Sequence, residues 1–179
     1  MLFRSNLDGV VYEEVRYEGY GPGGVAIMVD CITDNKNRTT PEIRTIFGKN
    51  GGNLGENGSV SYLFEKKGMI IIEGGAVSED EVMEMLLDYD VEDIKTEDGN
   101  IIITTGTEGY NEISDFLMKK EYNLIMNQLT YIPMTTVELD EKKAQQCLRI
   151  IELLEDQDDT QEVYSNYDIS DEIMSKLSE

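Results

Sequence analysis

The sequence predicts an α+β protein made of two ferredoxin-like α/β domains, with the second domain inserted into a discontinuous first. The apolar pattern of residues 69–132 reads strand, helix, strand, strand, helix, strand, which is the order of the split ferredoxin-like unit. The flanking segments, residues 1–68 and 133–179, each lack a complete set of layers. We therefore expect the two flanking segments to fold together as one domain.

Local start and turn signals mark the predicted inserted domain. Ser78 followed by Glu81 forms a capping box ahead of apolar residues at helical spacing, which predicts the first helix. Asp98-Gly99 lies between two β-branched runs and predicts a hairpin turn. The segment carries fifteen acidic residues against three basic ones. We expect a strongly acidic lobe here.

The first flanking segment predicts two strands with a helix between them. Residues 25–32 are almost continuously apolar, as in a central strand. The sequence Thr39-Thr40-Pro41-Glu42 predicts a helix start, because proline suits the first turn of a helix. Residues 50–58 are rich in glycine and asparagine and are expected to form a loop. Residues 60–64 alternate between apolar and polar and predict a strand.

The second flanking segment would complete that domain. Residues 135–139 are expected to be extended, residues 144–154 have the spacing of a long amphipathic helix, and residues 162–167 predict a closing strand. The two crossings into the insert, near residues 66–68 and Pro133, would then lie side by side as a double hinge. Residues 1–68 are nearly neutral, with eight basic and nine acidic residues, so the acidity lies outside the front segment.

Composition restricts the chemistry that the chain can perform. The formal net charge is −22 and histidine is absent, which removes the commonest general base and metal ligand. Cys31 and Cys147 are far apart and have no zinc-site spacing, which favours buried reduced thiols and a cytoplasmic location. No apolar run approaches membrane-spanning length, so no membrane partner is expected. We predict a non-enzyme with no catalytic residues, no metal and no cofactor.

A glycine motif is the densest feature of the front segment. Gly19-Tyr20-Gly21-Pro22-Gly23-Gly24 satisfies the G-x-G-x-x-G pattern of dinucleotide sites. Such a site requires the motif to open a helix, whereas here a strand follows and Pro22 lacks an N–H donor. We interpret the motif as a tight turn that shapes the neighbouring surface, together with Gly51 and Gly52.

The best candidate contact site follows the predicted central strand. Asp34 and Asn35 are suited to bonding backbone amides and shaping the loop. Four cations, Lys36, Arg38, Arg44 and Lys49, would be positioned to contact phosphate oxygens. Two alternatives remain: a solvated, self-capped turn, and internal bonds from the arginines to Glu18 or Glu42.

The front segment resembles the YebC/PmpR family of gene-expression regulators. The residues that carry the resemblance are Tyr17-Glu18-Gly19-Tyr20-Gly21-Pro22-Gly23-Gly24, Asp34-Asn35, Arg38-Thr39, Glu42, Arg44, Gly51-Gly52-Asn53-Leu54-Gly55, Gly58-Ser59-Val60 and Phe64. The similarity continues to the Ile169-Ser170-Asp171-Glu172 ending. It implies a basic helical N-terminal domain followed by two α/β domains, and this chain begins almost directly at the second of the three.

The resemblance implies a function in regulating transcription or translation. We expect the chain to bind a ribosome, RNA or, more weakly, DNA, because the basic domain that would attract duplex phosphates is expected to be missing from it. Basic proteins are a further expected partner of so acidic a chain. The alternative is an acidic protein-protein adaptor without nucleic-acid binding, and a third hypothesis is a small-molecule sensor.

Overall fold

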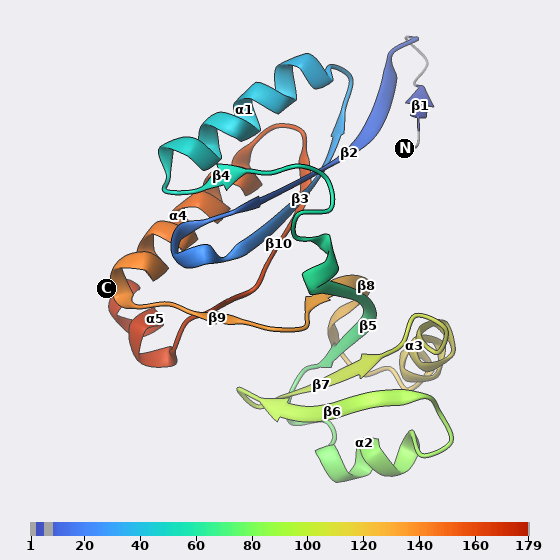
Figure 1. The fold of residues 1–179 in the computed structure, drawn as a ribbon. Helices are drawn as coiled ribbons and strands as arrows, with labels where there is room; N and C mark the ends of the chain where they lie inside the picture. Colours follow the sequence, from blue (N-terminus) through green and yellow to red (C-terminus); the bar gives the residue numbers. More distant parts are fainter. Residues whose placement is uncertain (1–2, 6–8, 179) are drawn as a thin grey trace. The chain divides into compact units, whose positions relative to one another are not determined.

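The computed structural model describes residues 3–5 and 9–178 and confirms the α+β class. The remaining residues, 1, 2, 6–8 and 179, lie outside the described part. The chain packs into two compact units, one made of Met1–Phe64 with Pro133–Glu179 and one made of Glu65–Ile132. Figure 1 shows the elements of both units.

The smaller unit has the strand order of the split ferredoxin-like fold. Its elements are β5 (Phe64–Ile72), α2 (Glu79–Met85), β6 (Val91–Glu97), β7 (Asn100–Thr105), α3 (Tyr110–Lys119) and β8 (Leu124–Pro133). They form one sheet in the order β6-β7-β5-β8, in which β7 pairs antiparallel with both β5 and β6. Apolar residues of α2 and α3, among them Val82 and Ile113, pack with Ile70 and Ile103 of the sheet in one core.

Both local signals in this unit operate as their chemistry predicts. The Ser78 side chain accepts a hydrogen bond from the Glu81 amide and begins α2. Asp98 and Gly99 have φ values of 51° and 81° between β6 and β7. A two-residue hairpin turn with positive φ at both positions matches the twist of the flanking strands.

The larger unit is built on an antiparallel sheet. Its strands are β1 (Phe3–Ser5), β2 (Val11–Tyr20), β3 (Ala26–Thr33), β4 (Asn53–Leu54) and β10 (Thr160–Ser165), in the order β1-β2-β3-β10 with β4 on β2. The helices are α1 (Lys36–Lys49), α4 (Glu141–Asp156) and α5 (Asp171–Leu177). The two short strands β9 (Val137–Glu138) and β11 (Tyr167–Asp168) pair in parallel. Along the chain this unit reads β1-β2-β3-α1-β4 and then β9-α4-β10-β11-α5, an order different from that of the smaller unit.

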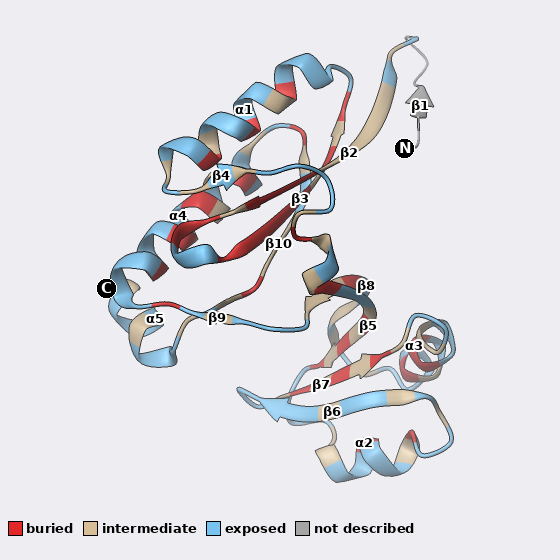
Figure 2. Cartoon of the chain, viewed as in Figure 1, coloured by how far each residue is buried: buried red, intermediate tan, exposed pale blue. Residues whose placement is uncertain are grey.

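One face of this sheet carries the main core. Alternate residues of β3, including Ile27 and Val29, pack with Ile43 and Phe47 of α1 and with Ile150 of α4. Strand residues alternate between the two faces of a sheet, so Met28 points to the opposite face. Met28 is nevertheless fully buried, which shows that the second face is partly covered as well. Figure 2 shows β3 buried along most of its length.

Three local predictions for this unit were wrong. Helix α1 begins at Lys36 rather than near Thr39, because the Asn35 side chain accepts the Asn37 amide and caps the helix early. Residues Ser61–Leu63 form a 3₁₀ turn instead of a strand, and β5 starts only at Phe64. The expected loop of residues 50–58 contains the short strand β4, whose residues pair with Gly19 and Tyr20.

Candidate nucleic-acid interface

The start of α1 is built on the end of the central strand β3. The Thr33 hydroxyl accepts the Asn35 amide at 3.0 Å, and the Asn35 side chain accepts the Asn37 amide at 3.1 Å. The polar loop that follows Thr33 is therefore self-capped, which is one of the two alternatives that the sequence analysis left open. This capping turns Lys36, Asn37 and Arg38 outward, and all three are exposed.

Arg38 is held by two carboxylates instead of by Glu18 or Glu42. Its Nη2 donates to Asp34 at 3.2 Å and to both oxygens of Asp159, at 3.1 and 3.0 Å. These hydrogen bonds, Asp159 first, raise the pKa of the guanidinium above its ordinary value. The Arg38 side chain nevertheless stays 44% exposed. It is thus a positioned cation whose charge is largely compensated.

Asp159 ties the start of α1 to the connection between α4 and β10. Its carboxylate accepts the Thr39 hydroxyl at 2.6 Å as well as Arg38, and its backbone carbonyl accepts the Ile32 amide at 2.9 Å. Burial on its own raises the pKa of Asp159, but the hydrogen bonds from Thr39, Arg38 and Gln157 hold that pKa below its ordinary value. Asp159 was not identified from the sequence as a contact of Arg38. A single acid directly before the predicted closing strand was the only signal.

The other three predicted cations carry no ion pair within the described residues 9–178. Lys36, Arg44 and Lys49 are all exposed on α1. With about 3.6 residues per turn, Arg38 and Lys49 lie about three turns apart on nearly one line, and Arg44 lies about a third of a turn away from that line. Lys36 lies on the line of Ile43 and Phe47 and is exposed as the first residue of the helix. Three of the cations therefore lie on the outer surface of α1, and Lys36 lies at its N-terminal end. The buried residues Thr39, Ile43 and Phe47 take the inner side.

The glycine motif forms the turn between β2 and β3. The Gly21 amide donates to the Val25 carbonyl at 2.7 Å, and Gly23 and Gly24 have φ values of 78° and 84°. Gly19 has a different role, because a Cβ there would lie 2.6 Å from the Asn53 carbonyl oxygen and 2.8 Å from Phe47. Its missing side chain lets β4 and α1 approach β2.

Glu18 lies in the glycine-rich front segment, and its structural role was not predicted from the sequence. Its carboxylate accepts the backbone amides of Gly58 at 2.7 Å, Val60 at 3.1 Å and Ser61 at 2.5 Å. Burial raises the pKa of Glu18, yet these three amide bonds outweigh burial and hold the pKa below its ordinary value. The residue is only 4% exposed. It fixes the glycine-rich segment 55–61 against the second face of the sheet.

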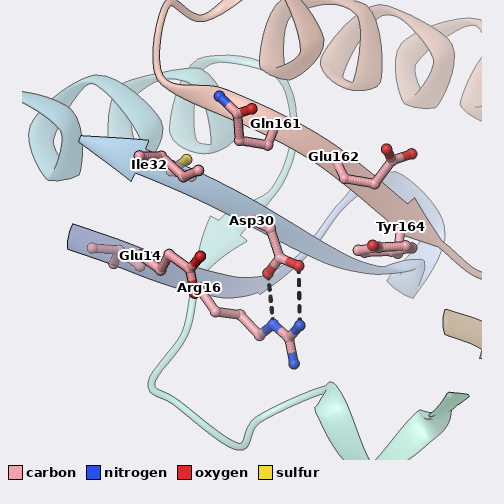
Figure 3. Close-up of a pocket in the computed structure, with 9 residues that line it drawn as sticks. Glu14, Arg16, Asp30, Ile32, Gln161, Glu162 and Tyr164 are labelled. Atoms are coloured by element: carbon pink, nitrogen blue, oxygen red, sulfur yellow. Dashed lines mark hydrogen bonds and ion pairs between the residues drawn. The ribbon is translucent and has the colours of Figure 1, made fainter. Parts of the chain in front are cut away.

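The uncovered part of that second face carries a different chemistry. Arg16 and Asp30 point toward one another from neighbouring strands and form a two-pronged ion pair, with Nε to Oδ1 at 2.6 Å and Nη2 to Oδ2 at 3.0 Å (Figure 3). With Glu14, Glu162 and Tyr164 they line a cavity of about 500 Å³. Acidic side chains predominate here, so this surface is unsuited to phosphate.

The described residues show no centre for metal or thiol chemistry. No group of three or more Asp, Glu or Cys side chains in residues 9–178 is placed to hold a metal ion. Burial raises the pKa of both Cys31 and Cys147 to about 11, so each remains a thiol at neutral pH. Within the same described part, none of the helices combines the length and apolarity that crossing a bilayer requires.

Comparison with known proteins places the chain in a family. The model of the second and third domains of TACO1/YebC proteins matches residues 12–167. A "probable transcriptional regulatory protein" of Syntrophus aciditrophicus is 51% identical over 170 residues, which cover 95% of this chain and 68% of that protein. A protein with the same description from Dictyoglomus turgidum is 49% identical over 175 residues, which cover 97% of this chain and 70% of the relative.

A solved structure supports the same placement. The crystal structure of a conserved hypothetical protein from Aquifex aeolicus superposes with a TM-score of 0.81 at 44% sequence identity. The match covers 94% of this chain and 70% of that one. The resemblance detected in the glycine-rich front segment is therefore confirmed, and the chain belongs to the TACO1/YebC family, in which its curated relatives are described as probable transcriptional regulatory proteins.

Proposed function

We propose that the chain is a non-enzymatic regulator of gene expression that docks on RNA or a ribonucleoprotein through the outer surface of α1. The observation that carries the proposal is the charge of this helix. Residues Lys36–Lys49 contain four cations and one acid, within a chain of net charge −22. Lys36, Arg44 and Lys49 supply phosphate contacts, while Arg38 adds a fixed donor at the start of the helix.

The ribosome is the most suitable partner of those considered. A net charge of −22 repels naked duplex DNA at long range, so DNA binding is expected to be weak. A ribosome offers basic protein as well as RNA, so it can engage α1 and the acidic surfaces together. In this proposal the protein works in the cytoplasm, in translation or in transcription.

Charge reversal on α1 tests the proposal. The variant carries Lys36→Glu, Arg44→Glu and Lys49→Glu, which leaves the structural contacts of Arg38 in place. The matched control carries Lys66→Glu, Lys119→Glu and Lys120→Glu, three exposed lysines of the smaller unit with the same total charge change. Binding is measured by ribosome co-sedimentation and by titration of labelled RNA at several salt concentrations.

We expect the α1 variant to lose ribosome binding. The slope of its log RNA affinity against log salt concentration should fall by an amount that corresponds to about two to three lost phosphate contacts. The control variant should bind almost as the parent does, apart from a uniform weakening by long-range charge. Equal losses in both variants would mean that only net charge matters and would refute a site on α1.

The adaptor hypothesis predicts a different pattern. A protein that binds only basic partners should retain the same partner after nuclease treatment of an extract, and the α1 variant should retain it too. Such a result would favour an adaptor acting through acidic surfaces such as the cavity beside Arg16 and Asp30.

A further inference from the structure

A small pocket lies between the end of α1 and the middle of α4. It has a volume of about 170 Å³ and is lined by Lys49, Asn50, Gly51, Gln146 and Arg149. Two cations from different helices therefore line one concavity, together with two side-chain amides. Arg149 was not among the predicted site residues. A lone basic residue in the apolar middle of the long amphipathic helix was the only sequence signal for it.

Neither cation is needed to complete the local structure. The carbonyl of Phe47 accepts the amides of Asn50 and Gly52, and the carbonyl of Ile46 accepts the Asn50 side chain at 2.7 Å. These bonds cap the last turn of α1 without the Lys49 ammonium. Within the described residues 9–178, neither Lys49 nor Arg149 lies within 4 Å of a carboxylate oxygen, although the chain has 37 acidic residues.

The chemistry of this lining selects a tetrahedral oxyanion. A guanidinium presents two parallel N–H donors to phosphate oxygens, an ammonium acts as a compact point charge, and the Gln146 amide can donate a further bond. A water molecule takes up about 30 Å³ of liquid, so the pocket has room for a phosphate group and some of its waters but not for a nucleoside.

We propose that the pocket between α1 and α4 binds a phosphate group, held by Arg149 and Lys49 with Gln146 as an additional donor. The inference deepens the proposed function and rests on it for the source of the phosphate, because Lys49 also belongs to the outer surface of α1. An RNA backbone and a free phosphate compound share this chemistry, so the experiment has to separate them.

The first experiment is an amide NMR titration with three probes: inorganic phosphate, adenosine monophosphate and a single-stranded RNA decamer. Sodium chloride at matched ionic strength is the control for screening. We expect all three probes to change the amide chemical shifts of Gly51, Arg149 and their neighbours. Of the three, RNA should saturate these changes at the lowest concentration. Arg149→Gln should abolish the response to inorganic phosphate, Arg149→Lys should retain part of it, and Lys142→Gln, an exposed cation at the start of α4, should leave it unchanged.

The second experiment measures RNA affinity of the same variants against salt. Arg149→Gln should lower RNA affinity about fivefold to tenfold for all RNA sequences. The slope of log affinity against log salt concentration should fall by about one, as expected for the loss of one phosphate contact. Tighter saturation by adenosine monophosphate than by the decamer would assign the pocket to a free phosphate compound. No local shift with any probe, combined with unchanged RNA binding in Arg149→Gln, would overturn the phosphate pocket.

The outcomes also separate this inference from the proposed function. If charge reversal at Lys36 and Arg44 abolishes RNA binding, while inorganic phosphate causes no local shift and Arg149→Gln leaves RNA affinity unchanged, the pocket is wrong and the α1 surface stands. If neither change affects RNA binding but inorganic phosphate still shifts Gly51, the pocket stands and α1 is not the RNA-binding surface. A thermal melt of Arg149→Gln confirms folding, and little change is expected because Arg149 is exposed.

Discussion

The Glu18 carboxylate holds a loop that has few other means of staying in place. Segment 55–61 contains two glycines and few apolar residues, and of its amides only that of Ser59 is bonded within the segment, to the Glu56 carbonyl, among the hydrogen bonds of the described residues. Glu18 satisfies three of them at once, and the Tyr20 hydroxyl adds a bond to the Ser59 carbonyl at 3.2 Å. A buried carboxylate with three amide donors is stabilised in its charged form.

The lowered pKa of Glu18 predicts a pH-dependent contribution to stability. Because the folded-state pKa lies below the ordinary value of 4.5, the stabilisation is complete above that value and is lost as pH falls through the folded-state pKa. Glu18→Gln should lower the free energy of unfolding by about 1–3 kcal/mol at pH 7. The difference from the parent should shrink below pH 4.5 in urea titrations. Glu56→Gln, an exposed acid in the same loop, should show no comparable effect at either pH.

Two glycines of the front segment should respond to alanine with opposite signs. A Cβ on Gly52 would collide with the carbonyl oxygen of Tyr20, whereas a Cβ on Gly48 in α1 meets nothing within 4 Å. Gly52→Ala should destabilise the larger unit by about 1–3 kcal/mol, because a backbone atom must move. Gly48→Ala should stabilise it by about 0.5–1 kcal/mol, because alanine favours helix. Unfolding midpoints in urea measure both, and a stabilising Gly52→Ala would contradict the close approach of β4 to β2.

At the scale of elements, α1 is fixed at both of its ends by hydrogen bonds. Its first turn is capped by Asn35, and Thr39 is buried against Asp159 of the α4–β10 connection. At its last turn, the Phe47 carbonyl accepts the amides of Asn50 and Gly52, and the Ile46 carbonyl accepts the Asn50 side chain. These attachments allow the helix to keep a proline, Pro41, inside its length. A proline there removes one N–H and leaves the carbonyl of residue 37 without its helical partner.

Pro41→Ala should therefore stabilise the larger unit. The substitution restores a helical hydrogen bond worth up to about 3 kcal/mol relative to proline, partly offset by the greater freedom of the unfolded chain. We expect a net gain of about 1–2 kcal/mol in the free energy of unfolding, measured by urea titration. Thr45→Ala at an exposed position later in α1 is the matched control and should change stability by less than about 0.7 kcal/mol. Destabilisation by Pro41→Ala would indicate that the proline is required for the early start of α1.

At the scale of the whole molecule, each unit has its own hydrophobic core. The core of the smaller unit is centred on residues such as Ile70, Ile103 and Leu117, and that of the larger unit on residues such as Ile27, Phe47 and Ile150. In the larger unit, the Met134 amide donates to the Leu63 carbonyl at 2.9 Å, which joins the two segments beside the point where the chain leaves and returns. We propose that the smaller unit is an inserted, independently folding domain.

Two shortened proteins test this proposal. Residues 65–132 expressed alone should unfold cooperatively in urea, because their sheet and core are complete. Residues 1–64 joined to 133–179 by a short Gly-Ser linker should also fold and should retain RNA binding through α1. The absence of a cooperative transition in the 65–132 fragment would show that the smaller unit depends on its neighbour.

The sequence by itself determined the features that depend on neighbours along the chain. The capping box at Ser78, the turn at Asp98-Gly99 and the α4 spacing all predicted local structure correctly, because hydrogen bonds over a few residues decide such features. The dense set of motifs in the front segment, glycines among them, was enough to identify the family. Local rules failed where distant residues compete, as at Ser61–Leu63, where the carboxylate of Glu18 draws in the backbone amides and a 3₁₀ turn replaces the alternating strand.

Only the tertiary structure decided which charges remain available to a partner. From sequence Arg38 and Arg44 were equivalent, yet Asp159 compensates Arg38, while Arg44 has no ion pair in the described residues 9–178. Lys49 and Arg149 are 100 positions apart in the chain, but the packing of α1 against α4 brings them to one pocket. Charge compensation acts over a few ångströms in space, and the packing of the core sets those distances, so sequence spacing cannot supply them.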